Sequence, residues 1–144
     1  MTSATDVPVI AAVSGKHMDA AVVNAAGLRA QHGKQPLVLL HVIEVDRAEP
    51  VDASDEDDLV QAEQVIAEAE RMVPKNGVDV RTEIKQARSA SAAIVDTAVV
   101  EGADTIVVGA HRFLGEHECD LGRTATHVLR HAPVAVIVCY EPIR

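Results

Sequence analysis

Apolar residues divide the chain into short apolar runs, separated by longer stretches in which apolar positions recur with helical spacing. The runs Val7–Val13, Pro36–Val45, Thr105–Gly109 and Val134–Cys139 are continuous and mostly β-branched, which predicts strands buried on both faces. The segment Val78–Ile84 instead alternates apolar and polar residues, which predicts a strand with one wet face, as at a sheet edge. The pattern therefore predicts five strands.

Four amphipathic stretches lie between these runs. Their apolar positions repeat every three or four residues, and Ser, Asp or Gly stands near most of their ends, as is typical of helix caps. The expected helices are His17 to Gly33, where Gly33 stops the helix; Ser54 or Asp55 to about Val73; Ser89 or Ser91 to Gly102; and about Gly122 to His131.

This alternation of strands and helices predicts one α/β domain over residues 1–144, a doubly wound five-stranded parallel sheet flanked by helices. Ligands of such folds bind beyond the carboxyl ends of the strands, where the winding reverses, here between strands one and four. The crevice is expected between Ser14–His17 and the Gly109–Gly122 loop. Residues 1–6 are expected to be a disordered tail and 46–58 a mobile acidic loop.

The closing strand is expected to lie at a sheet edge, although Val134–Cys139 is apolar on both faces. An exposed apolar edge promotes aggregation unless another strand covers it. We therefore expect a homodimer in which this strand pairs with the same strand of a second subunit.

Composition narrows the partners and the compartment. The net charge of −9 argues against nucleic acid, and no apolar run approaches the about 20 residues that a membrane-spanning helix needs. The first residues lack the pattern of a signal peptide. Two cysteines, Cys119 and Cys139, form no disulfide framework, so a reducing cytoplasm is expected.

Four segments carry a resemblance to a known family: "VIAAVSG", "LLHVIEV", "ADTIVVGA" and, most specifically, "HAPVAVIV". With them the chain resembles the universal stress protein family over essentially its whole length. The resemblance implies the adenine-nucleotide hydrolase-like type of parallel sheet, dimerisation by the last strand and a role in stress adaptation. Some members of this family bind ATP and others do not.

The ATP-binding members carry a loop of Gly, two residues, Gly, nine residues, then Gly followed by Ser or Thr. Gly109 and Gly122 match the first and third glycines, whereas Arg112 and Arg123 replace the second glycine and the hydroxyl residue. Thr124 stands one residue late, and Ser14 replaces the family's acid after strand one. By resemblance, the nucleotide-contacting positions are Ser14, Gly15, Val42, Gly109, Arg112, Gly122, Arg123 and Thr124.

Two interpretations of the arginines stay open. Arg112 and Arg123 either bind phosphate through charge-assisted hydrogen bonds, or fill the pocket and pair with nearby acids. Glu116, Glu118 and Asp120 lie in the same loop, and Asp120 is also a candidate cap for the last helix. A like-charge pair at about 4 Å costs roughly 4 kcal/mol at an effective dielectric of about 20, so a triphosphate is disfavoured without Mg²⁺ or loop movement.

The expected function is therefore a small cytoplasmic universal-stress-type protein that acts by binding, with an altered crevice that does not hold ATP in the usual way. The alternative is a sensor of ATP, AMP or a cyclic nucleotide, with Mg²⁺ as a further cofactor, that grips phosphate with Arg112 and Arg123. In either case Gly109 and Gly122 admit a second reading as turn glycines.

No enzyme motif is present, so no catalytic residue is expected. His111, His117 and Cys119 are of metal-ligand type but lack an established ligand spacing, and no metal site is expected. His41 and His131 are interpreted as hydrogen-bonded core or cap residues, and Lys16 as a solvated residue at a helix start.

Overall fold

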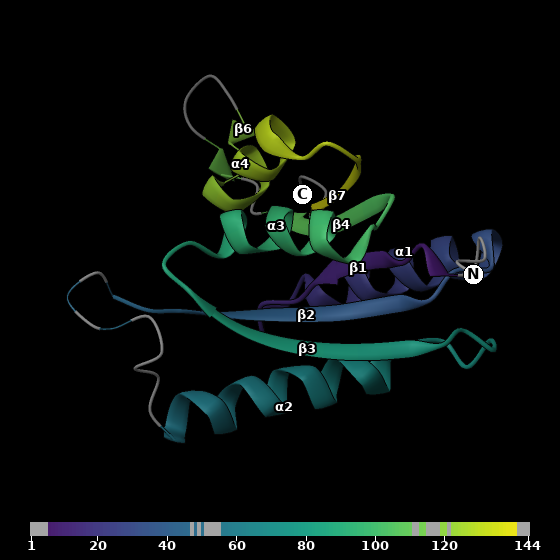
Figure 1. Ribbon diagram of the computed structural model, residues 1–144, viewed down its shortest axis with the longest axis horizontal. Helices are drawn as coiled ribbons and strands as arrows, with labels where there is room; N and C mark the ends of the chain where they lie inside the picture. Colours follow the sequence, from purple (N-terminus) through teal and green to yellow (C-terminus); the bar gives the residue numbers. More distant parts are fainter. Residues whose placement is uncertain are drawn as a thin grey trace.

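The computed structural model describes residues 6–46, 48, 50, 56–110, 122–140 and the backbone of 113–114 and 119–120. The parallel strands are β1 (Val9–Ala12), β2 (Leu37–Glu44), β3 (Val80–Ala87), β4 (Thr105–Ala110) and β7 (Ala135–Tyr140). They form a single five-stranded sheet in the order β3-β2-β1-β4-β7 (Figure 1). This confirms the predicted fold class and the predicted contact between strands one and four.

Four helices cover the two faces of the sheet: α1 (Asp19–Gly33), α2 (Glu56–Met72), α3 (Ala90–Glu101) and α4 (Arg123–His131). Helices α1 and α2 pack on one face, and α3 and α4 pack on the other. Two short strands, β5 (Phe113–Leu114) and β6 (Cys119–Asp120), pair in antiparallel fashion between β4 and α4. The sequence pattern had predicted only a loop there.

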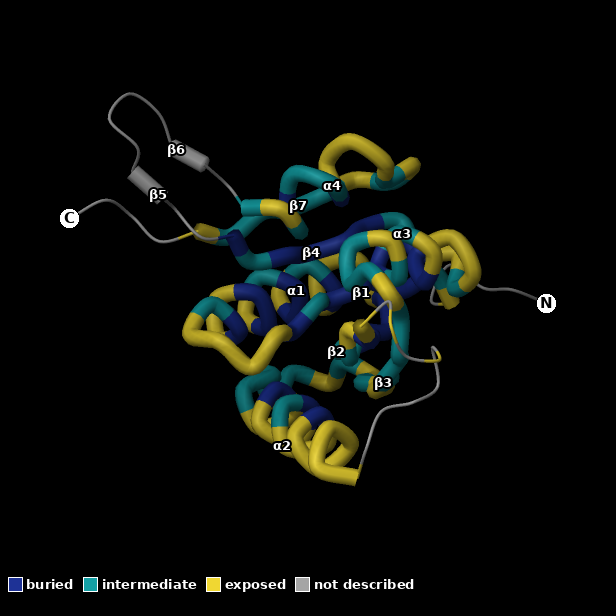
Figure 2. The backbone as a smooth tube through the Cα atoms, turned by 90° about the vertical axis from the view of Figure 1, so that its left-hand side faces the viewer, coloured by how far each residue is buried: buried dark blue, intermediate teal, exposed yellow. Residues whose placement is uncertain are grey.

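Two apolar cores result from the alternation of side chains along the strands. Val9 and Ala11 of β1 face α1 and α2, whereas Ile10 faces α3 and α4, and all three are fully buried. Figure 2 shows the buried backbone concentrated in β1, β2 and β4, with the outer side of α2 exposed. Strand β3 lies at an edge and is only partly buried, as its alternating sequence predicted.

The end of α1 corrects one sequence prediction. The left-handed residue that terminates the helix is Lys34, with φ of 53°, and not Gly33, which is still helical. The N–H of Lys34 instead closes the last turn on the carbonyls of Ala30 and Gln31. Gly33 is small for another reason: a Cβ there would overlap the Gln35 side chain. Packing, and not a positive φ, accounts for this glycine.

Other boundaries fall close to their predicted positions. Helix α2 begins at Glu56, inside the range 46–58 predicted as a loop, and its first turn carries three acidic residues that suit the positive end of the helix dipole. Helix α3 is capped by Ser89, whose Oγ accepts from the N–H of Ala92 at 3.2 Å, and it ends at Gly102 with φ of 68°. Residues 1–5 and most of 47–55 lie outside the described residues.

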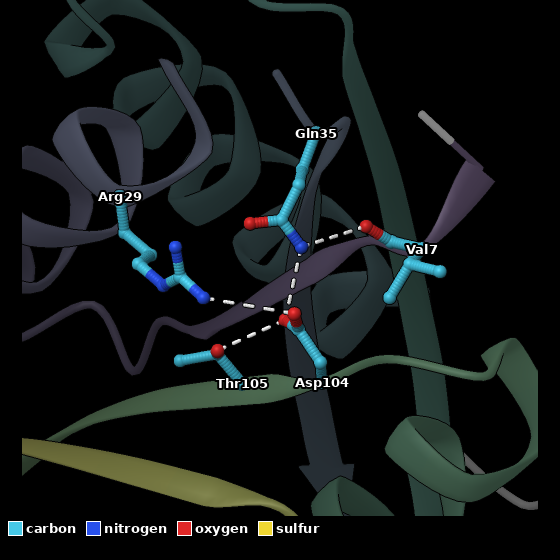
Figure 3. Close-up of polar contacts among 5 residues, drawn as sticks. All are labelled: Val7, Arg29, Gln35, Asp104 and Thr105. Atoms are coloured by element: carbon cyan, nitrogen blue, oxygen red, sulfur yellow. Dashed lines mark hydrogen bonds and ion pairs between the residues drawn. The ribbon is translucent and has the colours of Figure 1, made fainter. Parts of the chain in front are cut away.

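A polar cluster closes the amino end of the sheet (Figure 3). The Nε2 group of Gln35 donates to the carbonyl of Val7 and to Asp104 Oδ1, both at 2.9 Å. The hydroxyl of Thr105 donates to the same Asp104 oxygen at 2.9 Å, and Arg29 lies 3.6 Å from the other one. These contacts join the start of β1, the end of α1 and the start of β4.

Candidate nucleotide-binding site

A cavity of about 420 Å³ opens at the opposite, carboxyl end of the sheet. It lies where β1 and β4 are neighbours while their following helices pack on opposite faces, which is the point where the winding reverses. Its wall is built from the ends of β1, β2 and β4, the turn before α1 and the starts of α3 and α4. We refer to it as the carboxyl-end cavity.

Six of the eight predicted nucleotide-contacting positions line this cavity: Ser14, Val42, Gly109, Gly122, Arg123 and Thr124. Gly15 is not part of the lining. Its left-handed backbone, with φ of 83°, turns its Cα towards Val65 of α2, where a Cβ would come within 2.9 Å of a methyl group. Arg112 lies outside the described residues. The topology thus gathers residues that are more than 100 positions apart in the sequence.

The two signature glycines serve different structural purposes. Gly109 lies within β4, so the reading as a turn glycine is wrong for it. A Cβ there would come within 3.0 Å of Met18 and 3.3 Å of Val22, which means that α1 crosses the strand at close range. Gly122 is the N-cap of α4, with φ of 86° and open space where a Cβ would stand. Of these two glycines, only Gly122 has a backbone conformation that favours glycine over other residues.

Asp19, the first residue of α1, is a buried acid in the cavity wall that sequence reasoning missed. Its Oδ1 accepts from the N–H of Ser14 at 2.9 Å and from the Ser14 hydroxyl at 3.3 Å, and its Oδ2 accepts from the N–H of Gly15 at 2.7 Å. The carboxylate therefore holds the turn after β1 in shape. The sequence did contain a signal for this role, because Asp19 is an acidic residue at the start of an otherwise mostly apolar helix that follows the first strand.

Two further polar side chains border the cavity. His41 Nδ1 lies 2.8 Å from the carbonyl of Val13, and because a carbonyl can only accept, this nitrogen carries the proton. His41 is thus hydrogen-bonded, as predicted. Glu44 accepts from the N–H of Ala90 at 3.0 Å and so places a carboxylate at the start of α3. That charge suits the helix dipole.

The cations of the cavity are Lys16 and Arg123, and both side chains are exposed. None of the ion pairs between described residues involves either of them. Arg123 occupies the first turn of α4, where the helix dipole disfavours a positive charge. Glu116 and Glu118 and the side chain of Asp120 lie outside the described residues, so their predicted repulsion of phosphate stays a prediction.

A second hollow, of about 400 Å³, lies at the amino end of the sheet. Its lining balances two acids, Asp6 and Asp79, against two bases, Lys34 and Arg81. Arg81 already lies 3.7 Å from Asp79. Such a balanced wall has no preference for a charged ligand, and we therefore assign the candidate site to the carboxyl-end cavity.

Within the described ranges, no group of three His, Cys, Asp or Glu side chains is arranged to hold a metal ion. His111, His117 and the side chain of Cys119 lie outside those ranges. Burial raises the pKa of the Cys139 thiol, which disfavours the reactive thiolate. Among the described helices, none combines the length and the apolar content that a membrane crossing requires.

The family model of the universal stress protein family matches residues 8–139. The chain belongs to the universal stress protein family. A comparison with curated protein sequences gave no match. The family assignment agrees with the resemblance in the strand segments and with the position of the cavity.

Solved structures of the family share the fold. The universal stress protein from Archaeoglobus fulgidus is 22% identical, with a TM-score of 0.76 and 92% of each chain covered. The universal stress protein from Archaeoglobus fulgidus in complex with dAMP is 20% identical, with a TM-score of 0.74, covering 92% of this chain and 96% of that one. A universal stress protein in complex with cAMP is 19% identical, with a TM-score of 0.71 and coverage of 96% and 98%. Because these identities are low, the likeness establishes the shared fold and nothing beyond it.

Proposed function

We propose that this universal stress protein acts by binding an adenine nucleoside monophosphate in the carboxyl-end cavity, and that it regulates other processes through that binding without catalysing a reaction. The observation that carries the proposal is the position of Arg123 and the glycine-capped start of α4 in the wall of this cavity. The relatives solved with dAMP and with cAMP support it, because each of these ligands carries one phosphate group.

The start of α4 suits a single phosphate group. Its N-cap, Gly122, has no side chain that would cap the helix, and the helix dipole favours an anion there. Arg123 adds a guanidinium that can bind two phosphate oxygens at once. An anion at this position would also offset the unfavourable placement of Arg123 against the dipole.

The remainder of the cavity suits a base and a sugar. Val42, Leu40 and Ile94 supply apolar wall, while His41 and Ser14 supply polar groups at its border. A volume of about 420 Å³ lies within the roughly 300–1,000 Å³ typical of small-molecule sites. These features favour a nucleoside monophosphate over a free phosphate ion.

A triphosphate is a poorer match to the charges of this cavity, and we therefore retain the prediction that ATP is not held in the usual way. Arg123 and Lys16 are the described cations of the cavity, and Glu44 lies at its border. We therefore expect AMP to bind more tightly than ATP with Mg²⁺.

Isothermal titration calorimetry of the wild-type chain with AMP, cAMP and ATP·Mg tests this ranking. The variant Arg123→Gln should weaken AMP binding about tenfold or more, because a charge-assisted contact of roughly 1.5–3 kcal/mol is lost. The control Arg71→Gln removes the same charge from an exposed position on α2 and should leave binding unchanged. Equal affinity of wild type for ATP·Mg and AMP, or an Arg123→Gln variant with unchanged affinity, would refute the proposal.

We also propose that the protein is a homodimer through the edge strand at 134–139, as its sequence predicted. Strand β7 pairs with β4 on one side only, and most of its residues are only partly buried within one chain. Pairing with a second copy would satisfy the backbone groups of its outer side. Sedimentation velocity over a range of concentrations tests this, and a species of monomer mass at every concentration would exclude it.

A further inference from the structure

A second cleft, of about 480 Å³, lies between the start of α3 and one face of α4. It meets the carboxyl-end cavity at Gly122 and Arg123, which line both. From there it extends along α4 to the helix end, away from the strands that form the other cavity. We refer to it as the α3–α4 cleft.

The α4 wall of this cleft carries two arginines and two histidines. Arg123, His127, Arg130 and His131 are spaced by four, three and one residues, so they lie on one side of the helix. The rings of His127 and His131 are 4.3 Å apart between centroids. No acidic residue is part of the described lining, and neither arginine takes part in an ion pair between described residues.

One of the two arginines is placed unfavourably for the isolated helix. Arg123 stands at the positive end of the helix dipole, whereas Arg130 lies in the last turn, where the dipole favours a cation. The chain has 22 acidic residues against 13 lysines and arginines, so partners of the opposite sign are abundant elsewhere in the sequence. An anion bound in the cleft would lie close to both arginines and would offset the unfavourable placement of Arg123 at the start of α4.

The α3 wall contributes hydroxyl donors. Ser89 Oγ accepts from the N–H of Ala92 and lies 3.0 Å from Ser91 Oγ. Two adjacent hydroxyls can share only one hydrogen between them, so the second O–H hydrogen is left to donate elsewhere. Both serines line the cleft, opposite the arginines.

We propose that the α3–α4 cleft binds the phosphate group of a small phosphate monoester, at a site that borders the carboxyl-end cavity at Arg123 and extends along α4 to Arg130. A tetrahedral dianion matches guanidinium groups on one wall and a hydroxyl donor on the other. The chain carries a net charge of −9, so a long polyanion such as nucleic acid is a poorer match. The inference does not depend on nucleotide binding, because Arg130, His131 and Ser91 are not part of the carboxyl-end cavity.

The test is a titration with phenyl phosphate, followed by calorimetry and by the NMR signals of the histidine rings, with sodium chloride at matched ionic strength as the reference. The signals of His127 and His131 should shift with phenyl phosphate and not with chloride. Arg130→Gln should weaken this binding about tenfold, because one charge-assisted contact is lost. Arg71→Gln, which removes the same charge from the other face of the sheet, should leave it unchanged.

Two further measurements separate this proposal from the nucleotide proposal. Arg130→Gln should retain wild-type affinity for AMP, whereas Val42→Trp, which fills the carboxyl-end cavity, should abolish AMP binding and retain phenyl phosphate binding. If the histidine signals do not respond to phenyl phosphate, the inference is wrong. It is equally wrong if Arg130→Gln and Arg71→Gln weaken binding to the same extent, since that would mark a general charge effect.

Discussion

The two ends of the parallel sheet use polar residues in opposite ways. At the amino end, the side-chain nitrogen of Gln35 donates to Asp104 and to the carbonyl of Val7, and Thr105 donates to Asp104, so these groups find their partners within the chain (Figure 3). At the carboxyl end, polar groups surround a cavity, and the cation Arg123 has no ion-pair partner among the described residues.

This difference separates stability from binding within one small fold. A buried polar group that finds its partner inside the chain contributes to folding, whereas one that faces a cavity is left to bind a ligand. Asp19 is the exception that links the two roles, because it lies in the cavity wall yet binds the N–H groups of Ser14 and Gly15. Substitutions at both ends can test how complete the separation is.

The largest effect is expected at Gly109 in the cavity wall. In Gly109→Val the new side chain would collide with Met18 and Val22, so α1 must move off the sheet. We expect the free energy of unfolding to fall by about 3 kcal/mol in urea denaturation. Gly77→Asn is the control, since Gly77 has a left-handed φ that Asn tolerates and open space around it. Equal losses in the two variants would contradict the close approach of α1.

A smaller loss is expected for Asp19→Asn, which keeps the size of the side chain. The amide offers one acceptor oxygen where the carboxylate offers two, and its NH₂ group would face a backbone N–H. We expect about 2 kcal/mol of destabilisation by thermal or chemical denaturation, together with weaker AMP binding. If stability falls while AMP affinity is unchanged, Asp19 contributes to folding only, as the amino-end residues do.

At the amino end, Gln35→Leu should cost about 1–2 kcal/mol, because two hydrogen bonds are lost while the size is nearly kept. AMP affinity measured by calorimetry should stay at the wild-type value. A change in affinity would show that the two ends are coupled through β1 and β4, and the comparison drawn above would fail.

The smallest effect is expected at Glu83 on β3. A hydrogen bond with Glu101, together with burial and the charge of Glu101, raises the pKa of Glu83, against the opposing effect of Lys85. A raised folded-state pKa favours folding at low pH, and this contribution is lost as the pH rises through that pKa. Glu83→Gln should therefore stabilise the protein near pH 7 by less than about 1 kcal/mol after solvent screening, and not near pH 4.

Chemical denaturation at the two pH values measures the difference. Glu63→Gln on the exposed side of α2 removes the same charge and is the control for the change in net charge. A Glu83→Gln variant that is destabilised at neutral pH would show that the carboxylate has a favourable partner instead of a repulsive one.

Much of the fold follows from local sequence patterns, because each strand and helix has its own periodicity. The alternating segment Val78–Ile84 predicted an edge strand, and β3 is one. The cavity was placed correctly because the order of the elements fixes where the winding of a parallel sheet reverses. Six of the predicted positions therefore line it, including Arg123, which a search for the unaltered family pattern would have rejected.

The two errors, the position of the end of α1 and the missed Asp19, share a physical cause. Both depend on contacts between side chains and backbone that form only when the chain is packed. Lys34, and not Gly33, takes the left-handed conformation at the end of α1, and Gly33 instead leaves room for the side chain of Gln35. Asp19 accepts hydrogen bonds from the N–H groups of a turn that only the folded chain brings to it. Neither relation leaves a periodic signal in the sequence.

The hydrogen bonds of Asp19 also give the crevice a direction. Because this carboxylate already takes the amides after β1, that side of the crevice has no unused backbone donors from Ser14 or Gly15 and carries a negative charge of its own. Lys16 lies on the same side of the cavity, so the charges near β1 offset each other, whereas Arg123 at the start of α4 has no ion-pair partner among the described residues. In the proposed binding mode an elongated ligand would therefore place its phosphate towards α4 and its uncharged end towards β1.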